Sequence, residues 1–238
     1  MPSVLKSGAS PIYIPYMERK IDLVLTGCGA AAVYWIGHML ALRAAHVDVG
    51  RVYAASSGAL VGAALLCDVD PVACLRVLRA AHGRRWLACA MHEAMQTVLP
   101  SDAHTLCSGR LFVRTMRAGV PLRSVCTSVY ATRADLLDVL FATTVIPFVT
   151  APMFGHPLVD GSRHLDGVVA PSAEPRPGFE LVVLPVAMSL ASVALPSSEE
   201  VDIAVVRGAH AMCAILGVDP VLRIDLSPVA RPKKTEKG

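Results

Sequence analysis

The sequence predicts an α/β protein in which a mainly parallel sheet carries helices on both faces. Short runs of β-branched and aliphatic residues alternate along the chain with longer stretches of helical periodicity. Glycine-rich corners stand where the first two predicted strands give way to helices. Strands that alternate with helices usually pair in parallel, because each helix carries the chain back across the sheet. In such folds the chemistry lies at the carboxyl ends of the strands, where both corners fall.

Each element is predicted from its own pattern. Asp70 and Thr132 are typical helix N-caps, the first followed by a proline and the second by Asp135 three positions on. Asp160-Gly161 predicts a hairpin turn, with Asp166 at the end of the returning strand. Strands are predicted over residues 21–26, 51–54, 124–130 and 181–186, and helices over residues 31–45, 57–67, 71–81, 84–98, 105–118, 136–141 and 200–216.

The composition describes an apolar protein of one domain. The 238 residues suit one α/β domain with a sizeable core, and 54% of them are hydrophobic against 17% charged. A mean hydropathy of +0.52 indicates deep burial or contact with lipid. The net charge of +3 is too small to indicate a nucleic-acid partner. Seven cysteines, an odd number without metal-ligand spacing, favour reduced thiols in an intracellular protein that carries no metal or other cofactor.

Two apolar stretches have the composition of membrane spans. Residues 23–42 hold no Asp, Glu, Lys or Arg, but glycines interrupt them and their periodicity changes near Gly27. Residues 181–196 are shorter and contain Pro185. We therefore expect both to be core, and the N-terminus lacks the order of a secretory signal. The expected organisation is an N-terminal extension over residues 1–20, a domain over 21–217, and a segment over 218–238 that ends in a basic, disordered tail.

A serine stands at the second corner. Ser56 separates a strand-like run from a helix of small and aliphatic residues, so its hydroxyl would lie over the positive end of the helix dipole. The small neighbours Ala54 and Gly58 permit the tight turn that such a corner needs. This is the arrangement of a nucleophile elbow, although a serine between small residues is also common in apolar proteins.

The first corner contains a glycine loop, Gly27-Cys28-Gly29, that opens a helix. Free amides at such a loop point toward one spot and suit an anion, either a phosphate or a transient oxyanion. The loop lacks the spacing and lysine of a Walker motif, and Ala32 occupies the third glycine position of Gly-x-Gly-x-x-Gly. A plain strand-to-helix turn is the alternative.

Three corners follow one another along the chain: Gly27-Cys28-Gly29, then Ala54-x-Ser56-x-Gly58, then Asp166-Gly167. In this order they resemble the motifs of patatin-like lipid acyl hydrolases, above all those of the adiponutrin and adipose triglyceride lipase branch, whose oxyanion loop reads Gly-Cys-Gly. Residues 133–147 are similar to the helix and Ile-Pro turn before that family's aspartate, and residues 207–216 to its late Gly-x-x-x-Ala helix. The resemblance runs over residues 21–216 and implies the family's three-layer sandwich.

The resemblance implies a serine–aspartate dyad that needs no cofactor. Ser56 would attack an ester carbonyl, Asp166 would act as base, and the loop of Gly27, Cys28 and Gly29 would hold the oxyanion. The implied substrate is a glycerolipid, met by a cytoplasmic protein at the surface of a membrane or lipid droplet, where protein co-regulators are conceivable. A Ser-Asp-His arrangement with His210 as base competes with this dyad.

Three departures from the family pattern leave a second hypothesis about the protein's activity open. Ala54 replaces the first glycine of Gly-x-Ser-x-Gly, and Val168 stands where the family has Gly or Ala. Ala32 replaces the glycine that closes the oxyanion loop, and it would strain the loop if that position required a positive φ. The alternative is therefore a catalytically weak or inactive relative that binds lipid surfaces or proteins.

Overall fold

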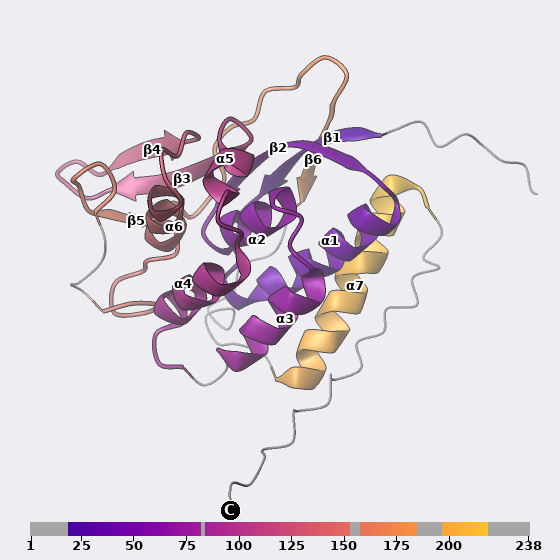
Figure 1. Cartoon of the computed structure of the whole chain (residues 1–238), viewed down its shortest axis with the longest axis horizontal. Helices are drawn as coiled ribbons and strands as arrows, with labels where there is room; N and C mark the ends of the chain where they lie inside the picture. The colour runs from indigo at the N-terminus through magenta and orange to yellow at the C-terminus, as the bar shows by residue number, and fades with distance from the viewer. Residues whose placement is uncertain (1–18, 82–83, 153–157, 185–196, 219–238) are drawn as a thin grey trace, which may run out of the picture.

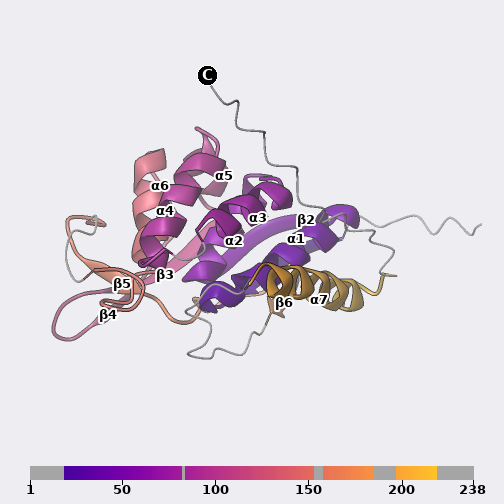
Figure 2. The same ribbon diagram turned by 90° about the horizontal axis from the view of Figure 1, so that it is seen from below.

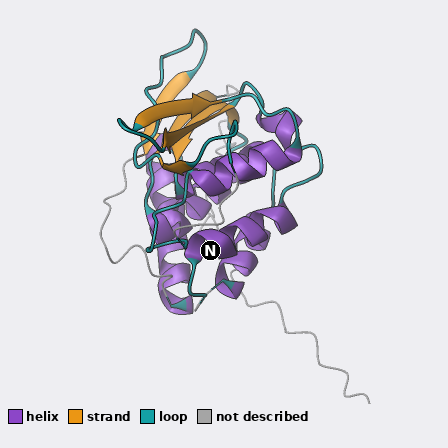
Figure 3. Cartoon of the chain, turned by 90° about the vertical axis from the view of Figure 1, so that its left-hand side faces the viewer, coloured by secondary structure: helices purple, strands orange, loops and turns teal. Residues whose placement is uncertain are grey.

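The computed structural model describes residues 19–81, 84–152, 158–184 and 197–218. Most of the expected N-terminal extension and almost all of the C-terminal segment, including the basic tail, lie outside these residues. The described part is a mixed α/β fold whose central, mostly parallel sheet is flanked by helices (Figure 1), so the predicted fold class is confirmed. Most of the helices gather on one side of the sheet (Figure 3).

The predicted order of strands and helices is largely confirmed. The Asp70 side chain caps its helix, and Thr132 and Asp135 form the predicted capping box. The strands are β1 (Lys20–Leu25), β2 (Asp48–Ala55), β3 (Leu111–Arg117), β4 (Arg123–Thr127), β5 (His164–Asp166) and β6 (Glu180–Leu184). The helices are a 3₁₀ turn (Gly29–Ala32), α1 (Val33–Ala44), α2 (Ser57–Leu66), α3 (Pro71–Ala80), α4 (Leu87–Val98), α5 (Ala103–Cys107), α6 (Arg133–Ala142) and α7 (Ser198–Leu216).

The helix predicted over residues 105–118 is wrong. Only α5 is helical there, and residues 111–117 form β3 inside the sheet. Side chains along β3 alternate between buried and half-buried, with Leu111, Val113 and Thr115 facing the core. This period of two is the strand pattern, and pairing with β2 on one side and β4 on the other decides the conformation.

The sheet has the order β4-β3-β2-β1-β6. Strands β3, β2, β1 and β6 are parallel, whereas β4 and β5 run antiparallel to β3. Strand β2 ends with Ala55 opposite Arg114 of β3, and β5 ends with Asp166 opposite Thr115, the next residue of β3. Because β2 and β5 pair with β3 in opposite directions, their carboxyl ends meet at adjacent positions along it.

The predicted turn at Asp160-Gly161 is confirmed, but its returning strand has a different partner. Both turn residues have positive φ (50° and 69°), and Val159 and Ser162 exchange two backbone hydrogen bonds across them. A two-residue turn with both φ values positive has the geometry of a tight hairpin loop. The returning strand β5 pairs with β3, and residues 153–157 before the turn lie outside the described residues.

Helices α1 and α7 cross in close contact, side by side in Figures 1 and 2. A Cβ on Gly37 of α1 would stand 2.0 Å from the carbonyl oxygen of Val205, and one on Gly208 of α7 would stand 2.0 Å from that of Tyr34. Only glycine fits at either position. This crossing explains the glycines in the predicted first and last helices.

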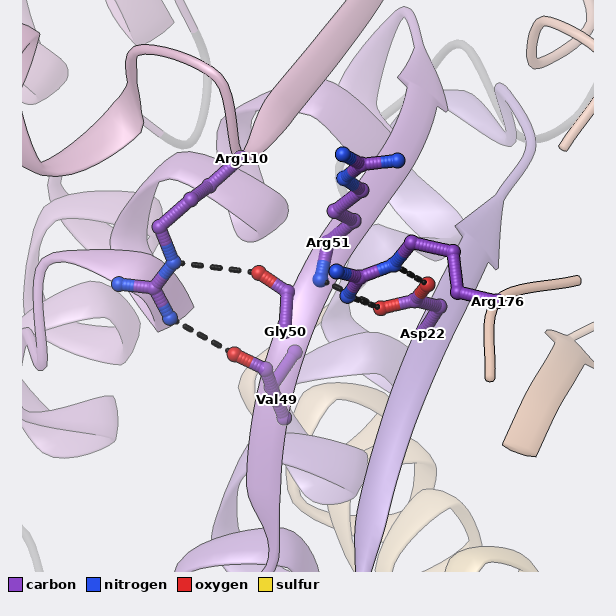
Figure 4. Close-up of polar contacts among 6 residues, drawn as sticks. All are labelled: Asp22, Val49, Gly50, Arg51, Arg110 and Arg176. Carbon is purple, nitrogen blue, oxygen red and sulfur yellow. Dashed lines mark hydrogen bonds and ion pairs between the residues drawn. The ribbon is translucent and has the colours of Figure 1, made fainter. Parts of the chain in front are cut away.

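A buried carboxylate near the amino end of β1, that of Asp22, joins this strand to β2 and forms an ion pair with Arg176 (Figure 4). The register between these strands shifts near Asp22, and the carboxylate of Asp22 accepts hydrogen bonds from the Arg176 guanidinium and from the Arg51 amide. Burial alone would raise the pKa of Asp22, but these hydrogen bonds outweigh it and hold the pKa below its usual value. Gly50 leaves room for the guanidinium, since a Cβ there would stand 2.4 Å from the Arg176 Nη2 atom.

No helix within the described part of the chain is long and apolar enough to cross a membrane. Residues 23–42 divide between the end of β1, the 3₁₀ turn and most of α1, in agreement with their assignment to the core. Of residues 181–196, those up to 184 belong to β6 and the remainder lie outside the described residues.

Candidate active site

The meeting of β2 and β5 brings Ser56 next to Asp166, although 110 residues separate them in the chain. Ser56 directly follows the end of β2, and Asp166 is the last residue of β5. The Ser56 hydroxyl donates a 2.6 Å hydrogen bond to the Asp166 Oδ2 atom. This distance is short for a neutral hydroxyl and typical of one that donates to a carboxylate.

The backbone of Ser56 adopts an unusual conformation. Its φ of 53° and ψ of −137° place it outside the regions that ordinary L-residues occupy, at the N-cap of α2. Such strain is typical of a serine on a sharp strand-to-helix turn. The neighbours fit the turn: Ala54 is fully buried, and a Cβ on Gly58 would stand 2.5 Å from the carbonyl oxygen of Leu25.

Thr143 holds this strained corner in place from the end of α6. Its hydroxyl accepts a hydrogen bond from the Ser56 amide at 2.8 Å and donates one to the Arg114 carbonyl oxygen at 2.7 Å. The side chain is completely buried, so water does not compete for these bonds. Sequence reasoning assigned no role to Thr143; the one available signal was its place in the segment that resembles the family.

The environment of Asp166 favours a carboxylate that is easily protonated. Burial raises the pKa of Asp166, and the hydrogen bonds from Ser56 and from the Val168 amide only partly offset that effect. The Val168 amide donates to the Oδ1 atom at 2.6 Å, so each carboxylate oxygen has a partner. Val168 itself has a φ of 61°, which strains a β-branched residue and explains why glycine would suit this position.

The glycine loop lies directly beside Ser56. A Cβ on Gly27 would stand 2.7 Å from the Ser56 Cβ atom. The Gly27 amide donates to the carbonyl oxygen of Val168 at 3.3 Å, and the Cys28 amide donates to the Ser57 hydroxyl at 3.2 Å. Within the described part of the chain, the Gly29 amide has no acceptor. Of the three predicted oxyanion donors, Gly29 is therefore the one whose amide is available without rearrangement.

The expected strain at Ala32 is absent. Ala32 has a φ of −53° and a ψ of −21°, an ordinary right-handed helical conformation. The positive φ of the loop falls on Gly29 instead, at 56°, where glycine adopts it at little cost. The condition under which alanine would damage the loop is not met.

The Cys28 thiol belongs to the packing under the loop. Its sulfur accepts a 2.8 Å hydrogen bond from the Trp35 indole and lies 3.5 Å from the Ser57 hydroxyl. Burial raises the pKa of Cys28 to about 11, so the thiol stays protonated at neutral pH. Both contacts fix the loop relative to α1 and α2.

An apolar pocket leads away from Ser56 and Asp166 into the protein. Helices α1, α2, α3 and α4 supply most of its wall, and most of the side chains that line it are apolar. Ser57, Leu60 and Ala64 line it at helical spacing, so the pocket follows α2 for about 10 Å at 1.5 Å per residue. Other residues of the wall are Ile36, Met39, Cys74, Val77, Met91, Met95 and Val98.

Among the described residues, no histidine side chain hydrogen-bonds to Ser56 or Asp166. His210 is exposed on α7 and is not among the residues that line the pocket. His164 is buried and bonded to the Thr115 hydroxyl, and His38 is buried against the Tyr34 carbonyl oxygen, so both are packing residues. The described residues contain no group of three His, Cys, Asp or Glu side chains that could hold a metal ion.

Comparison with known proteins finds several curated proteins to which this chain is similar. Patatin-like phospholipase domain-containing protein 2 of Rattus norvegicus is 28% identical over 170 residues, which cover 64% of this chain and 35% of that protein. Protein 5 of the same series, from Homo sapiens, is 28% identical over 169 residues, covering 64% of this chain and 39% of that protein. The omega-hydroxyceramide transacylase of Mus musculus is 27% identical over 162 residues, covering 61% of this chain and 26% of that protein.

Among solved structures, VipD from Legionella pneumophila matches 70% of this chain and half of its own with a TM-score of 0.44 and 12% identity. No protein-family model matches the chain.

The α/β fold places a serine–carboxylate pair in the wall of an apolar pocket. The relatives confirm the resemblance predicted from its motifs: over the matched region the chain is similar to patatin-like phospholipase domain-containing proteins. The matched region spans little more than a third of the length of the first relatives, so it corresponds to one part of them.

Proposed function

We propose that this protein is a serine lipid acyl hydrolase that cleaves carboxylic esters of glycerolipids. The observation that carries the proposal is the 2.6 Å hydrogen bond between Ser56 and Asp166 at the mouth of the apolar pocket. The patatin-like phospholipase relatives support a lipid hydrolase at the level of the family. The domain over residues 21–217 would carry this activity.

The dyad works through an acyl-enzyme. Asp166 accepts the proton of the Ser56 hydroxyl as the serine oxygen attacks the ester carbonyl. The tetrahedral intermediate collapses, the C–O bond to the alcohol breaks, and Asp166 returns the proton to the departing alkoxide. Water then attacks the acyl-serine while Asp166 takes a proton from the water. The bond from the acyl carbon to the Ser56 oxygen breaks, Asp166 returns the proton to that oxygen, and the fatty acid leaves.

The oxyanion of each intermediate would be held by the loop of Gly27, Cys28 and Gly29. The Gly29 amide is available in this structure, and the Cys28 amide becomes available when its 3.2 Å contact with the Ser57 hydroxyl opens. The Gly27 amide, bonded to the Val168 carbonyl oxygen, holds the loop in position. Preorganised donors of this kind supply a large share of the rate in acyl transfer.

The pocket suits one fatty acyl chain. Its wall beyond the serine consists mainly of aliphatic, methionine and alanine side chains, so most of an alkyl chain would lose contact with water against apolar groups. The alcohol side of the ester would lie toward the opening, near Val168. Glycerolipids present this combination of a long acyl chain and a polar or bulky alcohol.

An apolar rim at the pocket's mouth would face the lipid aggregate from which substrate is drawn. We define the rim as Ile146, Phe148, Val149, Val168 and Val169, all exposed, with 71% of the Phe148 side chain accessible to solvent. Ile146 and Val168 also line the pocket, so the rim is continuous with it. Residues 139–159 contain no Asp, Glu, Lys or Arg, and an uncharged apolar surface favours contact with lipid. This rim supports a peripheral position on a membrane or lipid droplet.

The test is release of fatty acid from triacylglycerol and from phospholipid vesicles by the purified protein. We expect Ser56→Ala to abolish release and Asp166→Asn to lower it by several orders of magnitude, with both variants folded by circular dichroism. Including an alcohol acceptor distinguishes hydrolysis from acyl transfer, the activity named for the transacylase relative. Equal release by wild type and both variants would overturn the proposal.

A non-catalytic lipid-binding protein of the same fold is the second candidate. The observation that favours it is the engagement of the Gly27 and Cys28 amides, together with the strained Val168. It predicts binding to vesicles that Ser56→Ala leaves unchanged and no release of fatty acid by the wild type.

A further inference from the structure

Two cysteines outside the Ser56 site lie in direct contact. Cys67 is the C-cap of α2 and Cys107 is the last residue of α5, 40 positions later in the chain. Their sulfur atoms are 3.7 Å apart, close to van der Waals contact, and a disulfide would draw them together to about 2.05 Å. Among the cysteines of the described residues, no other pair has its two sulfur atoms in contact.

We propose that Cys67 and Cys107 form a reversible disulfide by exchange with a small-molecule disulfide such as oxidised glutathione. The proposal rests on the contact of the two sulfurs and on their unequal exposure. It is independent of the proposed hydrolase activity.

The two thiols differ in a way that fixes the order of reaction. Cys67 is partly exposed and lines an open hollow on the surface beside Asp68 and Asp70, whereas Cys107 is completely buried. The hydrogen bond between the thiols lowers the pKa of Cys67, and the same contact raises that of Cys107. A reagent from solution therefore meets Cys67 first, and Cys67 is the thiol that ionises more easily.

The exchange proceeds in two balanced steps. The Cys67 thiolate attacks one sulfur of oxidised glutathione, its disulfide breaks, and one glutathione leaves as a thiolate, so Cys67 carries a mixed disulfide. The Cys107 thiolate then attacks the Cys67 sulfur, and the second glutathione leaves. Two protein thiols are oxidised, one glutathione disulfide is reduced to two thiols, and the two protein protons pass to the departing glutathiones.

The bond would close a covalent loop around part of the pocket wall. Helices α3 and α4 lie between Cys67 and Cys107 in the chain, and both line the pocket that leads from Ser56. Oxidation would therefore tie together the two ends of this segment. Reduction would release them.

The test is incubation of the full-length protein with oxidised glutathione, followed by digestion without reductant and peptide mass mapping. We expect a Cys67–Cys107 cross-link that dithiothreitol removes. Cys126, exposed and without a sulfur neighbour, serves as the accessible reference and should carry only glutathione. The wild-type result does not depend on whether any variant folds.

Two variants test the order of the steps. Cys107→Ser should leave one glutathione trapped on Cys67, because the resolving thiol is gone. Cys67→Ser should leave Cys107 unmodified, because the buried thiol does not reach the reagent, and Cys126→Ser should cross-link like the wild type. Two results would overturn the proposal. In the first, Cys67 stays free in samples whose Cys126 is glutathionylated. In the second, wild-type Cys67 carries a mixed disulfide while Cys107 is still free.

Discussion

The amide of Ser56 donates a 2.8 Å hydrogen bond to the hydroxyl of Thr143, 87 residues further along the chain. The same hydroxyl donates to the Arg114 carbonyl oxygen on β3. One threonine thus joins the end of α6 both to the corner that carries the serine and to the strand along which β2 and β5 meet. The strained backbone of Ser56 is held by a contact that only the tertiary structure provides.

Replacement of Thr143 by valine should loosen this corner while keeping its shape. The Ser56 amide would lose its buried acceptor, at a cost of about 1–3 kcal/mol in the free energy of unfolding. A misplaced serine oxygen should lower kcat by about a hundredfold. KM should change little, because Thr143 does not line the pocket. Urea unfolding and ester hydrolysis measure the two effects.

Thr143→Ser is the matched control, since it keeps the hydroxyl and removes one methyl group. Its kcat should stay close to that of the wild type. A Thr143→Val variant with unchanged kcat would show that the hydrogen bond does not position Ser56.

Local patterns were enough to predict the serine corner, the glycine loop and the capping box of Thr132 and Asp135, because each depends on neighbours within a few residues. They failed at β3, where apolar residues also suit a helix and pairing with β2 and β4 decides the conformation. The pairing of Ser56 with Asp166 came from a family resemblance. Its physical cause, the meeting of β2 and β5 along β3, is a matter of sheet topology that no local pattern records.

The raised pKa of Asp166 should appear in both activity and stability. The base must be ionised, so kcat/KM should fall with decreasing pH through a pKa above the ordinary value of 3.8. Stability should have the opposite dependence: because the folded pKa exceeds the unfolded one, the free energy of unfolding decreases as pH rises from the unfolded pKa through the folded one.

Asp166→Asn isolates this effect, because the amide keeps the size of the side chain and does not titrate. The difference between wild type and variant in the free energy of unfolding, followed by urea denaturation from pH 3 to 8, should show that decrease. A difference that is flat, or that rises with pH, would contradict the assignment.

Filling the pocket at Ala64 should change the preference for acyl chain length. Ala64 lies two turns of α2 beyond Ser57 and lines the pocket. Leucine at this position would occupy space that a long chain uses, so kcat/KM for long-chain esters should fall by about tenfold or more relative to short-chain esters. A series of p-nitrophenyl esters of increasing length measures the ratio.

The short-chain esters serve as an internal reference for folding and chemistry in Ala64→Leu, and Ala64→Ser, which adds little volume, should keep the wild-type profile. Equal losses for short and long chains would mean that the acyl chain does not enter along α2.

Phe148 should contribute to binding at a lipid surface. Its side chain is 71% exposed at the rim, and burial of a phenylalanine in lipid contributes about 2 kcal/mol, which corresponds to more than tenfold in affinity. Phe148→Ser should therefore bind phospholipid vesicles at least tenfold more weakly in sedimentation assays. Hydrolysis of a monomeric short-chain ester should fall far less than hydrolysis of vesicle lipid, because Phe148 does not line the pocket.

Val129→Ser is the control for this experiment. Val129 is 75% exposed in the loop that follows β4, outside the rim, so its replacement removes exposed apolar surface without touching the pocket's mouth. We expect its vesicle binding to match that of the wild type. If Val129→Ser weakens binding as much as Phe148→Ser, the attachment is general hydrophobic adhesion; if neither weakens it, another surface meets the lipid. If Phe148→Ser weakens vesicle binding and Val129→Ser does not, the rim around Phe148 is the surface that meets the lipid. A glycerolipid could then pass from the aggregate to Ser56.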